Sequence, residues 1–173
     1  MKLNLQPLPR EFYARDTVQV ARDLLGKYLV LKDKKFVITE TEAYCGEKDL
    51  ACHGAWRRKQ SCENLWGQPG RLYIYLTYGL HYMLNISTEK ENYPAAVLIR
   101  GLDKINGPGR VTKFLGINKS HDGLDITSGE FFIADGGQKP KYAAALRVGV
   151  AYAGLWAKKL WRFIIKYNNV RQS

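Results

Sequence analysis

Apolar and polar residues alternate with a period of two through Arg71–Ser87, and Tyr78-Gly79 interrupts the alternation near its middle. Such alternation is typical of a strand with one buried face, and two residues ending in glycine between such strands are typical of a hairpin turn. The pattern therefore predicts a β-hairpin with its tip at Tyr78-Gly79. The first turn residue is usually Asn, Asp or Gly, so the aromatic side chain of Tyr78 exposes its apolar surface to water unless it inserts into a partner.

Most of the remaining pattern indicates short strands joined by turns, with few helices. One helix is predicted after a cap at Asp16 or Thr17 and ends at Gly26. Another begins at Gly107–Arg110 and ends at Gly116. The other predicted strands are Tyr28–Leu31, Phe36–Glu42, Ala95–Leu102, Arg147–Val150 and Arg162–Lys166. Less periodic stretches predict an extended arm, a long polar loop and a shorter loop, at residues 1–15, 44–70 and 153–159.

Strands outnumber helices in this pattern, and most neighbours are joined by short turns. The sequence therefore predicts an α+β fold on a curved, mainly antiparallel sheet. The 173 residues are enough for one domain with its own core. Because the chain shows no internal repeat and no low-complexity linker, we expect a single domain over residues 1–173.

The charge balance points to a polyanionic partner. Lysine and arginine outnumber aspartate and glutamate by 27 to 16, which gives a net charge of +11. Nucleic acid is the commonest partner of such a chain, although a basic protein without one has the same count. The chain also has 11 tyrosines, and tyrosine is the aromatic residue that works half exposed to water. In this context, insertion between stacked bases is the interpretation we favour for a tip tyrosine.

The start of the chain has no apolar segment like that of a secretory signal, and no window approaches the length of a membrane span. The three cysteines are an odd set, which argues against a disulfide framework. Cys45, Cys52, His53 and Cys62 provide four potential zinc ligands, but they lack paired Cys-x-x-Cys spacing. We therefore expect an intracellular protein that contacts no membrane and binds no metal.

Two acids, Glu40 and Glu42, lie on one face of a predicted strand. Two acids on one strand face usually point into solvent. They indicate a catalytic site when they are buried beside a substrate. Glu42 is at the end of the predicted strand, where the long loop begins, and Tyr44 follows two residues later. This position favours Glu42 as a candidate general base.

Other polar and aromatic residues leave more than one interpretation open. His53 fits a surface histidine, a base-contacting group or a metal ligand. Tyr73 and Tyr75 share a strand face, where we favour a core position for Tyr73 and a pocket position for Tyr75. Asn85 and Arg100 lie among apolar neighbours on predicted strands, so they are site candidates if they point inward, since they would then need partners.

Two basic segments are candidates for phosphate contact. Gly107–Arg110 opens a helix, and free N–H groups at a helix start attract anions, although glycine and proline also mark ordinary turns. The run Arg57-Arg58-Lys59 in the long loop either faces phosphate or is simply solvated.

Nine segments, in this order along nearly the whole chain, together resemble the alkyladenine (3-methyladenine) DNA glycosylase family. They are Glu40–Tyr44, Ala51–His53, Pro69-Gly70, Tyr73–Gly79, Asn85–Ser87, Ala96–Arg100, Gly107–Arg110, Ile117–Ser120 and Arg147–Gly149. Each segment alone is a weak signal, whereas the combination is highly specific. The resemblance implies a mixed α/β domain with flanking helices and a protruding β-hairpin, and it implies no metal or organic cofactor.

The resemblance also assigns roles to single residues. Glu42 matches the carboxylate that activates water, Arg100 matches a residue that helps to hold that water, and the carbonyl of Val148 would be a third contact. Tyr44, His53 and Tyr75 match the walls that sandwich an extruded base. Asn85 matches the residue on the pocket floor that hinders the exocyclic amine of normal guanine. Tyr78 matches the wedge that fills the gap left by the base.

Phosphate contacts are expected at Gly109, Arg110 and Lys119. The chain departs from the family pattern at Cys62-Glu63, where Pro-Arg is usual, and Glu63 would repel a phosphate that an arginine would bind. Further departures are Leu65-Trp66 in place of Met-Phe, and Leu160 in place of Pro.

The resulting expectation is a monofunctional, monomeric DNA-repair glycosylase located with the DNA. It would flip an alkylated or deaminated purine from damaged duplex DNA and hydrolyse the N-glycosidic bond with a Glu42-activated water. Two alternatives remain open on the sequence. One is a nucleic-acid-binding module without catalysis, and the other is a zinc-dependent hydrolase built on the cysteines and His53.

Overall fold

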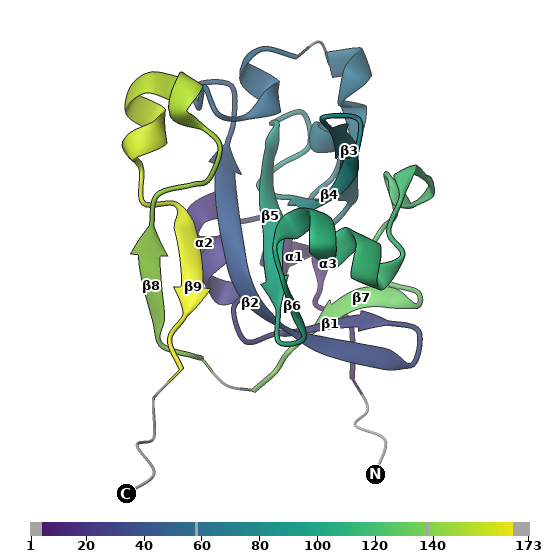
Figure 1. The fold of residues 1–173 in the computed structure, drawn as a ribbon. Helices are drawn as coiled ribbons and strands as arrows, with labels where there is room; N and C mark the ends of the chain where they lie inside the picture. Colours follow the sequence, from purple (N-terminus) through teal and green to yellow (C-terminus); the bar gives the residue numbers. More distant parts are fainter. Residues whose placement is uncertain (1–4, 58, 138, 168–173) are drawn as a thin grey trace, which may run out of the picture.

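The computed structural model describes residues 5–57, 59–137 and 139–167. It has a nine-stranded sheet and a few short helices (Figure 1). The strands are β1 (Tyr28–Leu31), β2 (Lys34–Cys45), β3 (Leu72–Thr77), β4 (His81–Ser87), β5 (Ala95–Leu102), β6 (Ile105–Asn106), β7 (Phe131–Ala134), β8 (Tyr142–Ala145) and β9 (Arg162–Ile165). The α-helices are α1 (Arg10–Tyr13), α2 (Thr17–Asp23) and α3 (Pro108–Leu115). The 3₁₀ helices are η1 (His53–Ala55), η2 (Lys59–Ser61), η3 (Glu63–Leu65), η4 (Lys119–His121) and η5 (Ala151–Lys158).

The sheet runs in the order β3-β4-β5-β2-β1-β7. Strand β6 pairs with β5, and β9 pairs with both β2 and β8. Every strand pair in the described part of the chain is antiparallel. The predicted α+β fold on a mainly antiparallel sheet is therefore confirmed, and the sheet is open rather than closed into a barrel.

Strand β2 organises the sheet because it is 12 residues long and has different partners along its length. Its first half pairs with β1, and its second half lies between β5 and β9. The register against β5 shifts on both sides of Glu40, which pairs with Gly101. A methyl group at Gly101 would lie 2.9 Å from Thr39 Oγ1, so glycine is needed for the strands to approach here. Both Glu40 and Glu42 are buried as a result.

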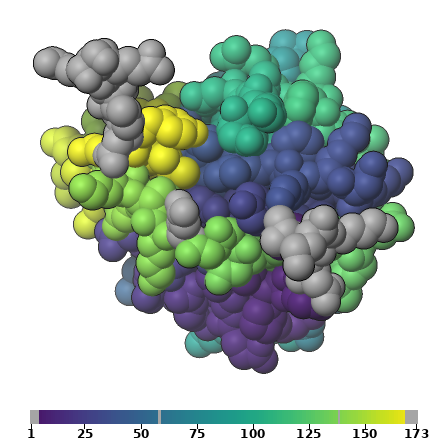
Figure 2. Space-filling view, turned by 90° about the horizontal axis from the view of Figure 1, so that it is seen from below, coloured from purple at the N-terminus to yellow at the C-terminus, as the bar shows by residue number. Residues whose placement is uncertain are grey.

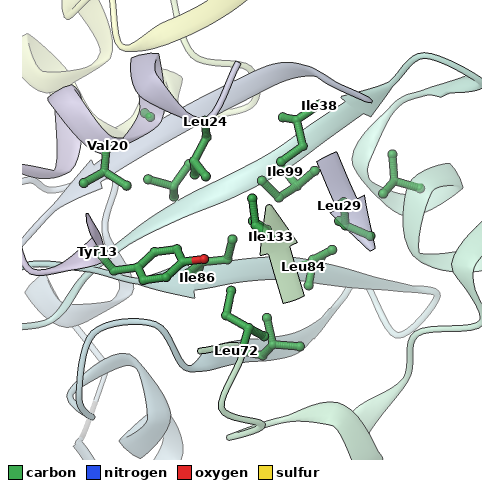
Figure 3. Close-up of a cluster of buried hydrophobic side chains, with 14 of the residues drawn as sticks. Tyr13, Val20, Leu24, Leu29, Ile38, Leu72, Leu84, Ile86, Ile99 and Ile133 are labelled. Atoms are coloured by element: carbon green, nitrogen blue, oxygen red, sulfur yellow. The ribbon is translucent and has the colours of Figure 1, made fainter. Parts of the chain in front are cut away.

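The main core lies between the sheet and the N-terminal helices. Val20 from α2, Leu24 directly after it and Tyr13 from α1 lie over strand residues that include Ile99 and Ile86 (Figure 3). The hydroxyl of Thr41 in β2 donates to a backbone carbonyl of α2, at Ala21, over 2.7 Å, which ties the helix to the middle of the sheet. The helix begins as predicted, because the carboxylate of Asp16 accepts a hydrogen bond from a backbone N–H of its first turn.

The N-terminal segment lies against β7, the edge strand at one end of the sheet order. Leu8 N–H donates to Ile133 O in β7 over 2.7 Å. Figure 2, which views the molecule from below, shows the purple N-terminal segment, the blue β1–β2 hairpin and the green segment near β7 packed together. No helix within the described residues is both long enough and apolar enough to cross a lipid bilayer.

Several predicted elements are confirmed and others are wrong. Strands Tyr28–Leu31 and Ala95–Leu102 have the predicted bounds. The arm predicted over residues 1–15 is not extended throughout, because α1 begins right after Pro9 and buries Tyr13; residues 1–4 lie outside the described part.

The end of the chain differs more from the prediction. Residues 147–150 are not a strand, because Gly149 has a φ of 75° and the neighbouring Arg147 side chain turns into the interior. The strand that pairs with β9 is instead β8, which the sequence pattern did not indicate. The loop predicted at residues 153–159 contains most of η5, with a kink at Gly154.

Candidate active site

The hairpin β3–β4 has Tyr78 at its tip, as predicted. Leu80 N–H donates to Thr77 O over 3.0 Å, and the two residues between them have positive φ angles, 49° at Tyr78 and 65° at Gly79. Because Thr77 pairs with His81, the loop has three residues rather than the predicted two. The left-handed conformation costs a bulky L-residue about 1–2 kcal/mol. Tyr78 adopts it while 90% exposed, which packing within the protein does not explain.

A cavity of about 830 Å³ lies beside this hairpin. Its walls come from β3, β4, β5, the loop around η1 and the segment leading into η5. In Figure 1, η5 and the loop of residues 46–70 lie at the top, at the end toward which β2 runs. Seven of the predicted site residues line the cavity, namely Tyr44, His53, Tyr75, Tyr78, Asn85, Arg100 and Val148. Its size is within the range of small-molecule sites, and six of the 22 lining residues are tyrosine or tryptophan.

Glu42 lies directly behind this wall and is fully buried. Tyr44 Oη donates to Glu42 Oε2 over 2.7 Å, and Val148 N–H donates to Oε1 over 2.8 Å. Arg100 Nε lies 3.6 Å from the same Oε1. The carboxylate is therefore held by three residues of the cavity wall, so it adjoins the cavity without being exposed in it.

Burial raises the pKa of Glu42 above its ordinary value. The nearby Arg100 charge, the Tyr44 hydroxyl and the Val148 N–H each oppose this effect, but burial outweighs them. A carboxylate with a raised pKa is a stronger base than an ordinary glutamate, and it keeps its proton to a higher pH.

Glu40 is the second acid on this face of β2, and it contacts two arginines. Its Oε1 accepts from Arg100 Nε over 3.0 Å and from Arg162 Nη1 over 3.1 Å. Arg100 is therefore closer to Glu40 than to Glu42. The two acids and two arginines form a charge-balanced group, in which Glu40 fixes the position of Arg100.

A second buried ion pair, between Arg147 and Asp49, lies near Glu42 and Tyr44. Arg147 donates to both carboxylate oxygens of Asp49, over 2.6 and 2.9 Å, and both side chains are fully buried. The guanidinium also donates to Ala43 O and Trp156 O and lies 4.9 Å from the ring centre of Tyr44. It thus fixes the backbone that carries the Val148 N–H. Sequence reasoning missed both residues, although Arg147 was part of a recognised segment.

The aromatic walls are connected to one another. His53 Nδ1 and Tyr73 Oη are 2.8 Å apart, and the His53 ring lies 4.4 Å from that of Tyr75 and 5.0 Å from that of Trp56. Burial, with a smaller effect of Arg57, lowers the pKa of His53 to about 4. His53 is therefore neutral at physiological pH. Burial also raises the pKa of Tyr75 to about 12, so its hydroxyl stays protonated.

Tyr73 and Asn85 resolve two interpretations that the sequence left open. Tyr73 is buried in a cluster with Cys52, Cys62 and Leu65, as predicted, although it also reaches the cavity. Asn85 points inward, and its Nδ2 donates to Tyr73 O and Met83 O over 3.2 and 3.3 Å.

Comparisons with known proteins show the family of the chain. The family model described as methylpurine-DNA glycosylase matches residues 11–106 and 102–169. The chain belongs to the methylpurine-DNA glycosylase family. It is accordingly a DNA glycosylase, an enzyme of DNA repair whose substrate is DNA.

Bacterial relatives cover nearly the full chain. A Rickettsia rickettsii protein named "Putative 3-methyladenine DNA glycosylase" is 45% identical over 169 residues, which is 93% of this chain and 91% of the relative. Proteins with the same name from Rickettsia felis and Sodalis glossinidius are 45% and 43% identical, and they cover 91% and 90% of this chain and 92% and 95% of their own lengths. These matches extend over both the hairpin and the buried acids.

The residues predicted to contact phosphate lie outside the cavity of this glycosylase. Gly109 packs against the hairpin, since a methyl group there would lie 2.9 Å from His81 Cβ. The side chain of Arg110 is exposed. Lys119 Nζ donates to Asp122 Oδ2 over 2.6 Å, so part of its charge is already compensated. Their contacts with DNA stay a prediction.

The departures at Cys62-Glu63 and Leu65-Trp66 fall in the loop before the hairpin, whereas Leu160 lies between η5 and β9. Cys62 and Leu65 are buried against Tyr73, whereas Glu63 is exposed. Arg58 of the basic run lies outside the described residues.

The four potential zinc ligands do not form a metal site, although Cys52 and Cys62 pack in one cluster. Within the described residues, no group of three or more His, Cys, Asp or Glu side chains is arranged to hold a metal ion. Cys52 Sγ is 3.1 Å from Pro94 O, and His53 contacts Tyr73 instead.

Proposed function

We propose that this glycosylase flips an alkylated or deaminated purine out of duplex DNA, hydrolyses its N-glycosidic bond and leaves an abasic site. One observation carries the proposal: a fully buried carboxylate, Glu42, adjoins an aromatic cavity large enough for a purine, next to an exposed tyrosine on a hairpin tip. The protein would act as a monomer on double-stranded DNA. If Glu42 were only a solvated surface acid, or the protein only a basic binding surface, neither the buried carboxylate nor the adjoining cavity would be expected.

The hairpin supplies the wedge. Taking a base out of the stack costs a few kcal/mol, and the cost is smallest for damaged or mispaired bases. Tyr78 enters the duplex from the minor groove and occupies the vacant space, which recovers part of the lost stacking. Its exposure at a conformationally strained tip is consistent with a side chain shaped for a partner.

The cavity supplies the recognition of the base. Tyr44, Tyr75 and His53 present ring faces and edges on which a purine can stack. A purine alkylated at N3 or N7 is cationic, which strengthens its attraction to aromatic faces. Because His53 is neutral, it adds no repulsive charge. Asn85 forms the floor and hinders the exocyclic amine of undamaged guanine.

The chemistry is assigned to Glu42 acting through water. Its carboxylate is buried behind Tyr44, Arg100 and Val148, which supports a role through a water molecule rather than direct attack on the sugar. A water held by Glu42, Arg100 and the Val148 carbonyl loses a proton to Glu42 and adds to C1′. The carboxylate also opposes the positive charge of the oxocarbenium-like transition state. None of the described residues that line the cavity is a lysine, so we expect the DNA strand to stay intact.

Release of free purine from methylated duplex DNA tests this function. The proposed enzyme releases methylated purines and leaves abasic sites in unbroken strands. A non-catalytic nucleic-acid-binding module, the alternative that the charge favours, would bind the same DNA and release nothing.

Replacing Tyr78 with alanine is expected to weaken binding to damaged duplex about tenfold, because the vacancy left by the base is then unfilled. Binding to the same lesion opposite a gap should change much less, since little stacking is lost there. Fluorescence anisotropy with both DNAs measures the two affinities. Equal losses on the two DNAs would contradict the wedge role, and Tyr167→Ala, at another exposed tyrosine, is the matched control.

Replacing Glu40 with glutamine is expected to move the acid limb of base release to lower pH. Arg100 would lose its charged partner Glu40 and interact more strongly with Glu42, which lowers the pKa of Glu42. In the wild type the pKa of Glu42 is raised, so activity should fall with decreasing pH at a higher pH than the ordinary pKa of glutamate would give.

The pH profile of the single-turnover rate measures this shift. Glu130→Gln removes one charge from an exposed position and should leave the profile unchanged. An acid limb that stays in place in Glu40→Gln would show that Glu40 does not influence Glu42.

A further inference from the structure

The cavity contains one arginine that no acid neutralises. Its lining includes two arginines, Arg57 and Arg100, and no aspartate or glutamate. Arg100 is paired with Glu40 and lies near Glu42. No carboxylate of the described residues makes an ion pair with Arg57. Its guanidinium instead lies over aromatic rings, 5.4 Å from the ring centre of Trp56 and 5.8 Å from that of Tyr75.

The charge of Arg57 acts on the walls that would hold the base. It adds to burial in lowering the pKa of His53, and it opposes the effect of burial on the pKa of Tyr73 and Tyr75. All three effects have the sign expected of a nearby cation. The charge of Arg57 therefore acts on the aromatic walls of the cavity, and at Tyr75 it opposes the charge of Glu42.

A cation beside the base has opposite consequences for two classes of lesion. A purine alkylated on a ring nitrogen enters as a cation and is repelled by Arg57. A deaminated purine such as hypoxanthine enters neutral. When its C1′–N bond breaks, the electron pair stays on the purine, which becomes an anion that Arg57 attracts.

We propose that Arg57 determines lesion specificity, favouring neutral damaged purines over cationic alkylated ones. This inference rests on the function proposed above. For a neutral lesion, the C1′–N bond breaks and a water oxygen bonds to C1′. The water proton goes to Glu42, and the purine anion is stabilised by Arg57 until it takes a proton from solvent water. Arg57 thereby does electrostatically what a general acid would otherwise do.

The competing role for Arg57 is a DNA-phosphate contact. Such a contact would help every lesion to the same extent, because the backbone is the same in all of them. The position of the Arg57 guanidinium over Tyr75 favours a role toward the base rather than toward phosphate, since the Tyr75 ring is a wall of the cavity. The two roles predict different changes when the charge is removed.

The test compares Arg57→Gln with the wild type on two duplexes of one sequence, carrying either hypoxanthine or 7-methylguanine. For hypoxanthine, kcat/KM should fall about tenfold, since the charge acts across several ångströms of protein. For 7-methylguanine, kcat/KM should rise several-fold. The ratio of the two activities should therefore change by more than tenfold. Arg57→Lys keeps the charge and should stay near the wild-type ratio.

Two controls separate the possible failures. Arg110→Gln removes an exposed charge outside the cavity and should leave the ratio unchanged. An equal fall on both lesions with Arg57→Gln, or an unchanged ratio, would overturn the specificity role while leaving the glycosylase function intact. A wild-type protein that releases neither base would contradict the function itself, and the specificity with it.

Discussion

Replacing Glu42 with glutamine is expected to lower the single-turnover rate of base release by about 10²- to 10⁴-fold, the usual contribution of general acid–base catalysis. Glutamine has nearly the same shape and can still accept hydrogen bonds from Tyr44 and Val148. It cannot take a proton from water or oppose positive charge on the sugar. Release of free base under saturating enzyme measures the loss.

Affinity for damaged duplex distinguishes catalysis from structure in this variant. Because Glu42 lies behind the cavity wall, binding by Glu42→Gln should stay within a few-fold of the wild type. Loss of binding together with activity would make Glu42 a structural residue. Glu91→Gln changes an exposed glutamate between β4 and β5 and should retain full activity.

Replacing Asp49 with alanine is expected to lower the free energy of unfolding by about 3–5 kcal/mol, because it leaves the buried Arg147 charge without its partner. Base release should also fall at temperatures where the variant is folded, since Arg147 fixes the backbone next to Val148. Urea unfolding and single-turnover rates measure the two effects.

A second substitution tests the reason for this loss. Asp49→Ala combined with Arg147→Met removes both charges and should recover part of the stability. Asp135→Ala breaks an exposed pair with Lys27 and should cost less than about 1 kcal/mol. A similar small cost for Asp49→Ala would mean that the buried pair does not hold this part of the structure together.

Local patterns predicted the centre of the sheet well. Ala95–Leu102 is a mostly apolar run, and most of it is buried. Arg71–Ser87 alternates with the period of two that is typical of strands, and the interruption marks the turn between them. Each signal is contained within a few residues. The hairpin tip was therefore visible in the sequence, although the third loop residue, Leu80, was not.

Long-range contacts explain what the sequence did not predict. Asp49 and Arg147 are 98 residues apart, and neither has a local pattern that marks it as buried. The segment after Arg147 alternates like a strand, but the buried guanidinium and the positive φ of Gly149 turn the backbone instead. Strand β8 was missed because its alanine-rich sequence has weak strand propensity, and pairing with β9 determines it.

The candidate site shows the same division. The inward positions of Glu42, Asn85 and Arg100 follow from their strand faces once the partners of those strands are known. Arg57 looked like part of a solvated basic run. Only its place over Tyr75, at the cavity wall, distinguishes it from its neighbour Lys59, which contacts Asn92.

The most direct test of the whole account is a set of duplexes, each carrying one defined damaged purine, incubated with excess enzyme and scored for abasic product. We predict abasic sites in intact strands for at least one damaged purine and none in the undamaged duplex. Binding to these duplexes without any abasic product would contradict the account.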